Sequence, residues 1–300
     1  MYPDSAERKN PRSKPLTSLL PWGLAHLAEL EALSRRRRLR THPGVDLPVA
    51  RDRILGRLAP GDRDRLTARL LILLDNSERL GLKMSHPGAS GWPDLLSEIS
   101  APPFMLWMKG DPAALAPPGI AIVGAREAGP DALRAVTNLS REIASLGMCV
   151  VSGLARGVDG AAHRGALEGS GRTIAVVGTG LDRVYPDSHR SLERAILEGG
   201  GLVLSEFPPG EAPEAWHFPQ RNRLIVGLSV AVVAGPHRRR SGTYITARIA
   251  LEEGRELLVF DRDARGWERE GPGLLESEGS RRIGGAEEIL SAILPEGNTT

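Results

Sequence analysis

The twelve residues SGLARGVDGAAH, at positions 152–163, combine backbone and side-chain groups that are able to bind an anion. They follow the apolar run MCVV and precede a segment with helical spacing, so a strand, a glycine turn and a helix start occur in that order. Glycine lets the backbone approach an oxygen-rich ligand, and the N–H groups and dipole of a helix N-terminus favour negative charge. The candidate phosphate contacts of this turn are Ser152, Gly153, Arg156, Gly157 and the nearby His163.

Three further turns share this pattern at strand ends. GIAIVG leads to Gly124 and Arg126, RTIAVVGTG leads to Gly178 and Gly180, and RRRSGTYITAR opens a helix near Gly242. A short turn between a strand and a helix needs glycine for its geometry whatever it binds, but arginine at three of the four turns favours a phosphate-binding rim. The candidate residues of these three turns are Gly124, Arg126, Gly178, Gly180, Arg240, Ser241, Gly242, Thr243 and Arg248.

A long gap in acidic residues adds to this pattern. No Asp or Glu occurs between Glu214 and Glu252, while the same stretch contains six arginines. Part of it, LIVGLSVAVVAG, has the pattern of a buried strand, where acids are not expected. The flanking segments FPQRNR and PHRRRSG are predicted loops, where acids are tolerated. Arginines without local carboxylates suit a linear polyanion better than a single nucleotide.

The segment WHFPQRNR places aromatic rings beside guanidinium groups. Such planes stack on unpaired bases, and each stack contributes about 1–3 kcal/mol with little dependence on sequence. The candidate residues are Phe218, Arg221, Asn222 and Arg223. An equal alternative for Phe218 is a core position, and for Trp216 we favour a packing role.

Motifs for catalysis and cofactor binding are missing from the sequence. The dinucleotide fingerprint G-x-G-x-x-G is incomplete in GTGLDR, and the Walker lysine pattern does not occur. No Ser/His/Asp order and no H-E-x-x-H motif marks a hydrolase or a metal enzyme. Asp159 and His163 stand four residues apart, but an acid in a first helical turn more commonly complements the helix dipole. We expect no cofactor, no metal and no catalytic activity.

Composition places few limits on the partner. The net charge of +2 and the pI of about 8.9 do not by themselves indicate a polyanion. The single cysteine, Cys149, falls in a predicted buried strand. The first residues, MYPDSAERKNPRSKP, lack the apolar core of a signal peptide, and no run approaches the roughly 20 apolar residues that span a bilayer. We expect a cytoplasmic protein without membrane contact.

The elements that must position these turns divide the chain into three parts. We expect a disordered leader at residues 1–14 and a small helical domain at residues 15–100, where LAHLAELEAL and DRLTARLLILLDNSERL have helical periodicity. From 101 to 296, apolar strands alternate with helical stretches, which predicts an α/β fold, a Rossmann-like parallel sheet flanked by helices. In such a sheet ligands bind at the carboxyl ends of the strands, where the four glycine turns lie.

Four segments together resemble the DNA-processing protein A (DprA/Smf) family: SGLARGVDGAAHRGALEGSGRTIAVVGTGLDRVYP, SEFPPG, FPQRNRLIVGLS and SGTYITARIALEEGRE. The resemblance extends from about residue 102 to residue 260 and more weakly to the end. It implies an extended Rossmann-like fold, a homodimer and binding of single-stranded DNA. It also implies that the protein protects incoming DNA and loads the RecA recombinase onto it during natural transformation, with no catalytic step of its own.

Particular residues follow from the same resemblance. Carried over by motif, the single-strand pocket would contain Arg126, Ser152, Gly153, Gly157, Phe218, Arg221 and Arg223, and phosphate would be cradled by Ser241, Gly242 and Thr243.

The chain also departs from the family pattern. Ala125 stands where a small hydroxyl residue is usual, AGPHRRRSG replaces a segment that tends to carry an acid, and DRDARG replaces Pro-Gly after the last strand. We expect no C-terminal winged-helix module. The alternative function is a nucleotide-processing enzyme of the lysine-decarboxylase-like phosphoribohydrolase type. Those enzymes carry PGGxGT with a following glutamate, whereas the nearest counterpart here, RRSGTYITAR, has no acid within reach.

Overall fold

The computed structural model describes residues 13–34 and 46–294. The leader expected at residues 1–14 lies outside the described residues, apart from its last two positions. The helices are α1 (Ser13–Ser34), α2 (Leu47–Gly56), α3 (Pro60–Arg79), α4 (Asp94–Glu98), α5 (Pro130–Ser145), α6 (Val158–Glu168), α7 (Arg190–Glu198), α8 (His217–Gly227), α9 (Gly242–Glu252), α10 (Glu270–Ser277) and α11 (Ala286–Ile293). The strands are β1 (Lys83–Ser85), β2 (Leu106–Gly110), β3 (Gly119–Val123), β4 (Cys149–Ser152), β5 (Thr173–Val176), β6 (Leu202–Ser205), β7 (Ala231–Ala234), β8 (Glu256–Val259) and β9 (Arg281–Arg282). No helix within these ranges is both long enough and apolar enough to span a bilayer.

The strands form one sheet in the order β1-β2-β6-β5-β4-β3-β7-β8-β9. All pairs from β6 to β9 are parallel, which confirms the predicted Rossmann-like sheet. At one edge, β2 pairs antiparallel with β6, and β1 pairs antiparallel with β2, so two antiparallel strands that the sequence pattern did not indicate extend the parallel sheet. The three residues of β1 are exposed or half-buried, so they lack the apolar pattern that marks the other strands.

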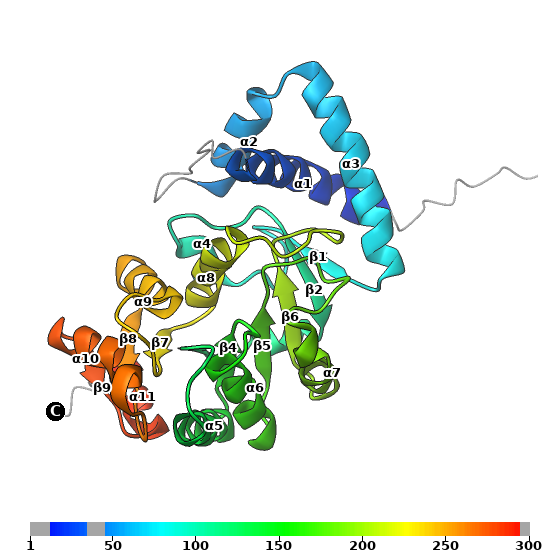
Figure 1. The fold of residues 1–300 in the computed structure, drawn as a ribbon. Helices are drawn as coiled ribbons and strands as arrows, with labels where there is room; N and C mark the ends of the chain where they lie inside the picture. The colour runs from blue at the N-terminus through cyan, green and yellow to red at the C-terminus, as the bar shows by residue number, and fades with distance from the viewer. Residues whose placement is uncertain (1–12, 35–45, 295–300) are drawn as a thin grey trace, which may run out of the picture.

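Helices cover both faces of the sheet because its central strands are apolar on both sides (Figure 1). Alternate residues of one strand point to opposite faces. Ile120 and Val150 therefore belong to the core under α5, α6 and α11, whereas Ala121 and Val151 belong to the core under α4, α8 and α9.

The N-terminal helices pack beside the edge of the sheet that β2 extends (Figure 1). Leucines of α1 and α3 share a core with Trp107 of β2 and Val203 of β6. The indole Nε1 of Trp107 donates a hydrogen bond of 3.0 Å to Ser77 Oγ on α3. Residues 15–100, expected as a helical domain, also include β1, which extends the sheet, and α4, which packs against α8.

A buried polar cluster joins α1 to the sheet. It consists of His26, Glu29, Glu206 and Arg223. His26 Nε2 donates to the carbonyl oxygen of Glu206 at 2.6 Å, and Arg223 Nη2 forms an ion pair with the Glu206 carboxylate. Burial raises the pKa of Glu29 to about 8, although the charge of Arg223 opposes this shift. Burial lowers the pKa of His26 to about 4, so both groups are uncharged in the folded protein at neutral pH.

We predict that Glu29 makes stability depend on pH. Its pKa is about 8 in the folded protein and ordinarily 4.5, so its contribution is fully present below pH 4.5 and is lost as the pH rises towards 8. Glu29→Gln mimics the neutral acid and removes this dependence. Chemical denaturation should show Glu29→Gln gaining about 4 kcal/mol relative to the wild type between pH 5 and pH 9, because the wild type loses about 1.4 kcal/mol per pH unit between pH 5 and its folded pKa of about 8. His26 is present in both proteins, so its own titration cancels. A difference that stays constant over this range would contradict the prediction.

Candidate functional site

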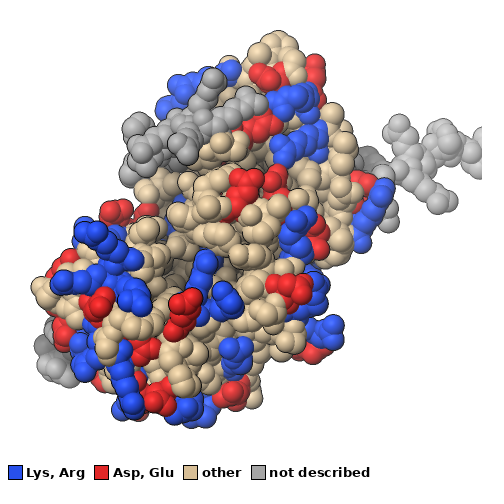
Figure 2. All heavy atoms as spheres, viewed as in Figure 1, with Lys and Arg blue, Asp and Glu red and all other residues tan. Residues whose placement is uncertain are grey.

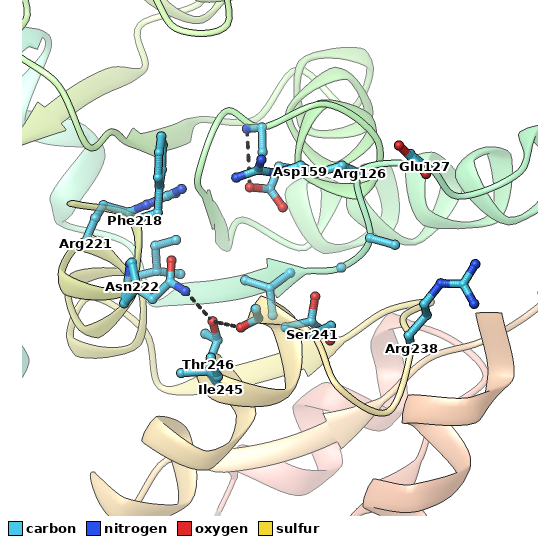
Figure 3. Close-up of a pocket in the computed structure, with 18 of the residues that line it drawn as sticks. Arg126, Glu127, Asp159, Phe218, Arg221, Asn222, Arg238, Ser241, Ile245 and Thr246 are labelled. Carbon is cyan, nitrogen blue, oxygen red and sulfur yellow. Dashed lines mark hydrogen bonds between the residues drawn. The ribbon is translucent and has the colours of Figure 1, made fainter. Parts of the chain in front are cut away.

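The order of strands reverses between β3 and β7. The chain places β4, β5 and β6 successively on one side of β3 and then returns to place β7 and β8 on its other side. The loops that follow β3 and β7 therefore leave the sheet in opposite directions, and a crevice opens at the carboxyl ends of these two strands. A cavity of about 400 Å³ lies at this position. We call it the β3–β7 cavity (Figure 3).

The β3–β7 cavity is lined by residues from several segments of the chain. Gly124, Arg126 and Glu127 follow β3, and Arg238 follows β7. The helices α8 and α9 supply the opposite wall. Its lining residues from α8, and from α9 with its N-cap, are Phe218, Pro219, Arg221, Asn222, Ile225, Ser241, Gly242, Thr243, Ile245 and Thr246.

A second cavity of about 240 Å³ adjoins the first at the ends of β4 and β5. Its lining includes Gly153 and Arg156 from the predicted glycine turn, together with Gly178 and Tyr185. We call it the β4–β5 cavity, and the two together the groove. The residues that line both cavities are Arg126, Ala155, Phe218 and Arg221. The groove is therefore a row of two compartments along the edge formed by the strand ends.

Arg126 and Phe218 stand where the two compartments meet. The guanidinium carbon of Arg126 lies 5.5 Å from the centroid of the Phe218 ring, and the Tyr185 ring lies 5.7 Å from the same ring on the side of the β4–β5 cavity. Arg126 is exposed, and no carboxylate in the described ranges lies within 4.0 Å of it. An aromatic cluster with an unneutralised guanidinium is suited to stacking on bases and contacting phosphate.

Arg221 lies buried beneath the pair formed by Arg126 and Phe218 and lines both cavities. Its Nη1 donates to the carbonyl oxygen of Val176 at 2.9 Å. A Cβ atom at Gly153 would lie 1.5 Å from Nη1, so glycine is required there to make room for Arg221 rather than for a ligand. Burial lowers the pKa of Arg221 to about 10, and the charge of Asp159 opposes the shift. Arg221 is therefore charged at neutral pH.

Asp159 lies on the floor of the β3–β7 cavity between Arg126 and Arg221 (Figure 3). Its Oδ2 accepts hydrogen bonds from the backbone N–H groups of Gly153 at 3.1 Å and Ala155 at 3.4 Å, which hold the turn between β4 and α6. Burial raises the pKa of Asp159, and the charge of Arg221 opposes that shift. This acid fixes the loop and balances a buried cation.

The N-terminus of α9 faces the same cavity. Ser241 is its N-cap, with Oγ accepting a hydrogen bond of 3.2 Å from the N–H of Tyr244. The N–H groups at the start of a helix have no intrahelical acceptor, so those of Gly242 and Thr243 are available to an anion. Asn222 Nδ2 donates to Thr246 Oγ1 at 2.8 Å and so ties α8 to α9.

The surface on this side of the molecule carries both basic and acidic side chains. Figure 2 shows a recess near the middle of this face, with basic and acidic side chains both at its border. Glu127 is an exposed acid in the lining of the β3–β7 cavity. Among residues 13–34 and 46–294, no group of three or more His, Cys, Asp or Glu side chains could hold a metal ion.

Several predicted contacts lie outside the groove because they have structural partners. Ser152 is fully buried, and its Oγ donates to the carbonyl oxygen of Ile122 at 2.6 Å, which ties β4 to β3. His163 is fully buried, with Nδ1 2.8 Å from Thr173 Oγ1, and burial lowers its pKa to about 3. The structure does not support a phosphate contact for either residue.

Two predicted glycines also shape the backbone instead of lining the groove. Gly157 has φ +73° at the N-cap of α6, and a Cβ there would lie 2.2 Å from the carbonyl oxygen of Ala125. It therefore packs the turn after β4 against the turn after β3. Gly180 donates its N–H to the carbonyl oxygen of Glu211 at 3.0 Å, and it lines neither cavity itself.

Three predicted arginines do not reach the groove. FPQRNR is not a loop but the first turns of α8, and residues two apart on a helix point roughly 200° apart. Arg221 faces the groove, so Arg223 faces away and pairs with Glu206. No carboxylate is close to Arg223 in the sequence, as the acid-free stretch indicated, but the fold brings the carboxylate of Glu206 next to it. Arg240 and Arg248 are exposed, and neither lines a cavity of the groove.

The lining residues missing from the predicted site include three with a large ring or a cation. Tyr185 lies in the loop after β5, and Arg238 and Trp267 lie in the loops after β7 and β8. Arg238 was visible in the acid-free stretch, but only the strand order shows which of its three consecutive arginines lines the cavity. Trp216 has the packing role that we favoured, with its ring edge-on to Phe207 at 5.7 Å.

Comparison with known proteins identifies the family. A family model described as DNA recombination-mediator protein A matches residues 83–294. The chain belongs to this family. It is 34% identical over 251 residues to the DNA processing protein DprA of Bacillus subtilis, which covers 83% of this chain and 84% of that protein. It is 38% identical over 196 residues to the DprA of Streptococcus pneumoniae, which covers 65% of this chain and 69% of that protein. The resemblance inferred from the motifs is confirmed.

Solved structures of DprA proteins share the fold. The X-ray structure of DprA from Streptococcus pneumoniae aligns with a TM-score of 0.73 at 31% identity, over 94% of this chain and 98% of that chain. A structure of the Helicobacter pylori protein, described for its single-stranded DNA binding mode, aligns with a TM-score of 0.61 at 30% identity, over 70% of this chain and 94% of that chain.

Proposed function

We propose that this protein binds single-stranded DNA in the groove, protects incoming strands and delivers them to a RecA-type recombinase. The observation that carries the proposal is the pair Arg126 and Phe218 at the junction of two adjoining compartments. A strand whose neighbouring nucleotides enter the two compartments would place a base against Phe218 and a phosphate near Arg126.

The shape and charge of the groove favour a strand over a small nucleotide. The β3–β7 and β4–β5 cavities form a row, and the N-terminus of α9 offers further N–H donors along it. Aromatic rings at Phe218 and Tyr185 suit any base because every base has a π-face. The binding of single-stranded DNA by the Helicobacter pylori relative supports the same assignment.

The later steps of the proposal rest on the family. The description of the matching family as recombination mediators supports delivery of the strand to a RecA-type recombinase. A homodimer, a cytoplasmic location and a binding role without catalysis belong to the same proposal. A direct check measures recombinase filament assembly on strands covered by single-strand-binding protein, with and without this protein.

A competition experiment tests the proposed binding. Labelled oligo(dT) bound to the protein is challenged with unlabelled oligo(dT), with duplex of the same length and with dTMP. We expect the single-stranded oligomer to compete at the lowest concentration and dTMP to compete at least about 100-fold less effectively, because it offers only one phosphate and one base. Equal competition by dTMP would refute strand binding and would favour the nucleotide-processing enzyme.

A further inference from the structure

A second guanidinium–aromatic pair lies in the β3–β7 cavity. Arg238 follows β7 and Trp267 follows β8, and the guanidinium carbon of Arg238 lies 4.4 Å from the centroid of the Trp267 ring. Both residues line the cavity that Arg126 and Phe218 also line. In Figure 3, Phe218 and Arg238 lie at opposite ends of this pocket, with Ser241 between them. Neither Arg238 nor Trp267 belongs to the motif segments that resemble the family.

Hydrogen bonds between the two loops hold this pair in place. The N–H of His237 donates to the carbonyl oxygen of Glu268 at 3.0 Å, and the N–H of Gly271 donates to the carbonyl oxygen of His237 at 2.9 Å. The buried carboxylate of Glu268 also accepts from the N–H groups of Gly129 at 2.5 Å and Arg265 at 2.8 Å. The loop of Arg238 is therefore fastened directly to the loop of Trp267.

The contact with the indole leaves Arg238 ready to bind an anion. The indole lies against the guanidinium, and the planar set of N–H donors of an arginine lets a phosphate accept two hydrogen bonds at once. Arg238 is exposed, and no carboxylate among the described residues lies within 4.0 Å of its guanidinium. Glu127 lies on the same side of the pocket but forms no ion pair with it.

We propose that Arg238, oriented by Trp267, binds an additional phosphate of the same DNA strand. The strand then passes from the Phe218 end, across the N-terminus of α9, to the Arg238 end. This inference rests on the proposed function, because it extends the strand bound at Arg126 by one further contact. Trp267 acts as a positioning residue, since its indole fixes the plane of the guanidinium and Arg238 makes the contact.

The test measures oligo(dT) affinity over a range of salt concentrations for a small set of variants. We expect Arg238→Ala to weaken binding about 10-fold and to make the log–log salt slope less negative by about 0.7, the value for one phosphate of a single strand. The matched control is Arg239→Ala, which removes the same charge one residue along but from a side chain that does not line the cavity. It should change affinity less than about twofold, as expected for a charge at the rim.

Variants of Trp267 test its positioning role. Trp267→Leu should weaken binding about 3- to 10-fold, whereas Trp267→Phe keeps an aromatic face and should retain most of the affinity. Adding Trp267→Leu to Arg238→Ala should cause no further loss, because the two residues act as one unit. Wild-type unfolding temperatures in these variants would exclude a folding defect.

The outcomes separate this inference from the proposed function. Equal effects of Arg238→Ala and Arg239→Ala, with Arg126→Ala still damaging, would overturn the inference and leave the strand-binding groove intact. Independent, additive losses from Arg238→Ala and Trp267→Leu would refute the positioning role of Trp267. A wild-type protein that does not bind oligo(dT) would overturn both proposals.

Discussion

Arg223→Ala is expected to destabilise the fold by about 3–5 kcal/mol, the usual cost of removing one partner from a buried ion pair. The side chain of Arg223 is 12% exposed and that of Glu206 only 2%, so the variant leaves a carboxylate buried without its cation. The cluster with His26 and Glu29 lies between α1 and the sheet, and its disruption also weakens the docking of α1. Thermal unfolding, which should shift down by about 10 °C, and urea denaturation measure the effect.

A second variant distinguishes a lost ion pair from lost packing. Adding Glu206→Gln to Arg223→Ala removes the uncompensated charge, so the double variant should recover part of the stability. If Arg223→Ala unfolds like the wild type but loses affinity for oligo(dT), then Arg223 contacts DNA, as the motif resemblance implied, and its placement in the buried cluster is wrong.

Arg126→Ala is expected to weaken oligo(dT) binding by about 10- to 100-fold and to leave the unfolding temperature unchanged. Hydrogen bonds to charged groups contribute about 1.5–3 kcal/mol each, which corresponds to this range. Arg126 is exposed, and its ring contact with Phe218 is at the surface of the groove, so the fold does not depend on it. Fluorescence anisotropy with labelled oligo(dT) and a thermal melt give the two readouts.

The matched control for this variant is Arg248→Ala. Arg248 is an exposed arginine of α9 that the sequence pattern also assigned to the site, but it lines neither cavity of the groove. Its removal should change affinity less than about twofold. Comparable losses from Arg126→Ala and Arg248→Ala would indicate that binding depends on overall charge and not on the groove. Arg221 is a poor probe, because its burial against Val176 and Asp159 means that its removal disturbs folding and binding together.

Local patterns were sufficient to predict most of the fold. Apolar strands such as GIAIV at β3 alternate with helical segments, and this alternation determines a parallel sheet with ligands at its carboxyl edge. The antiparallel extension was missed because β1 has only three residues, none of them buried. Its pairing with β2 depends on contacts that no local pattern records.

The sequence placed residues in the groove correctly where the strand order determines their position, and it misplaced residues whose position depends on side-chain partners. Arg126 and Phe218 meet in the groove because the segments that follow the ends of β3 and β6 meet at one edge. Ser152 and His163 were assigned to phosphate, but distant partners, Ile122 and Thr173, bury them. Treating FPQRNR as a loop hid the opposite orientations of Arg221 and Arg223 on α8.

The Arg238–Trp267 pair is a contact in the groove that the sequence pattern did not predict. The two residues are separated in the chain by all of α9 and all of β8, and the pairing of β7 with β8 brings their loops together. Trp267 is a single tryptophan in the charged segment DRDARGWERE, and nothing in that segment indicates a functional role for it. Its place beside the groove follows from the sheet order and could not be read from spacing.

The salt dependence of oligo(dT) affinity tests most directly whether the groove binds a linear polyanion. Each phosphate neutralised on a single strand contributes about −0.7 to the slope of log affinity against log salt concentration. Contacts at Arg126, the N-terminus of α9 and Arg238 therefore predict a slope of about −2 or steeper between about 50 and 200 mM salt. A slope near zero, with dTMP bound as tightly as the oligomer, would contradict the account.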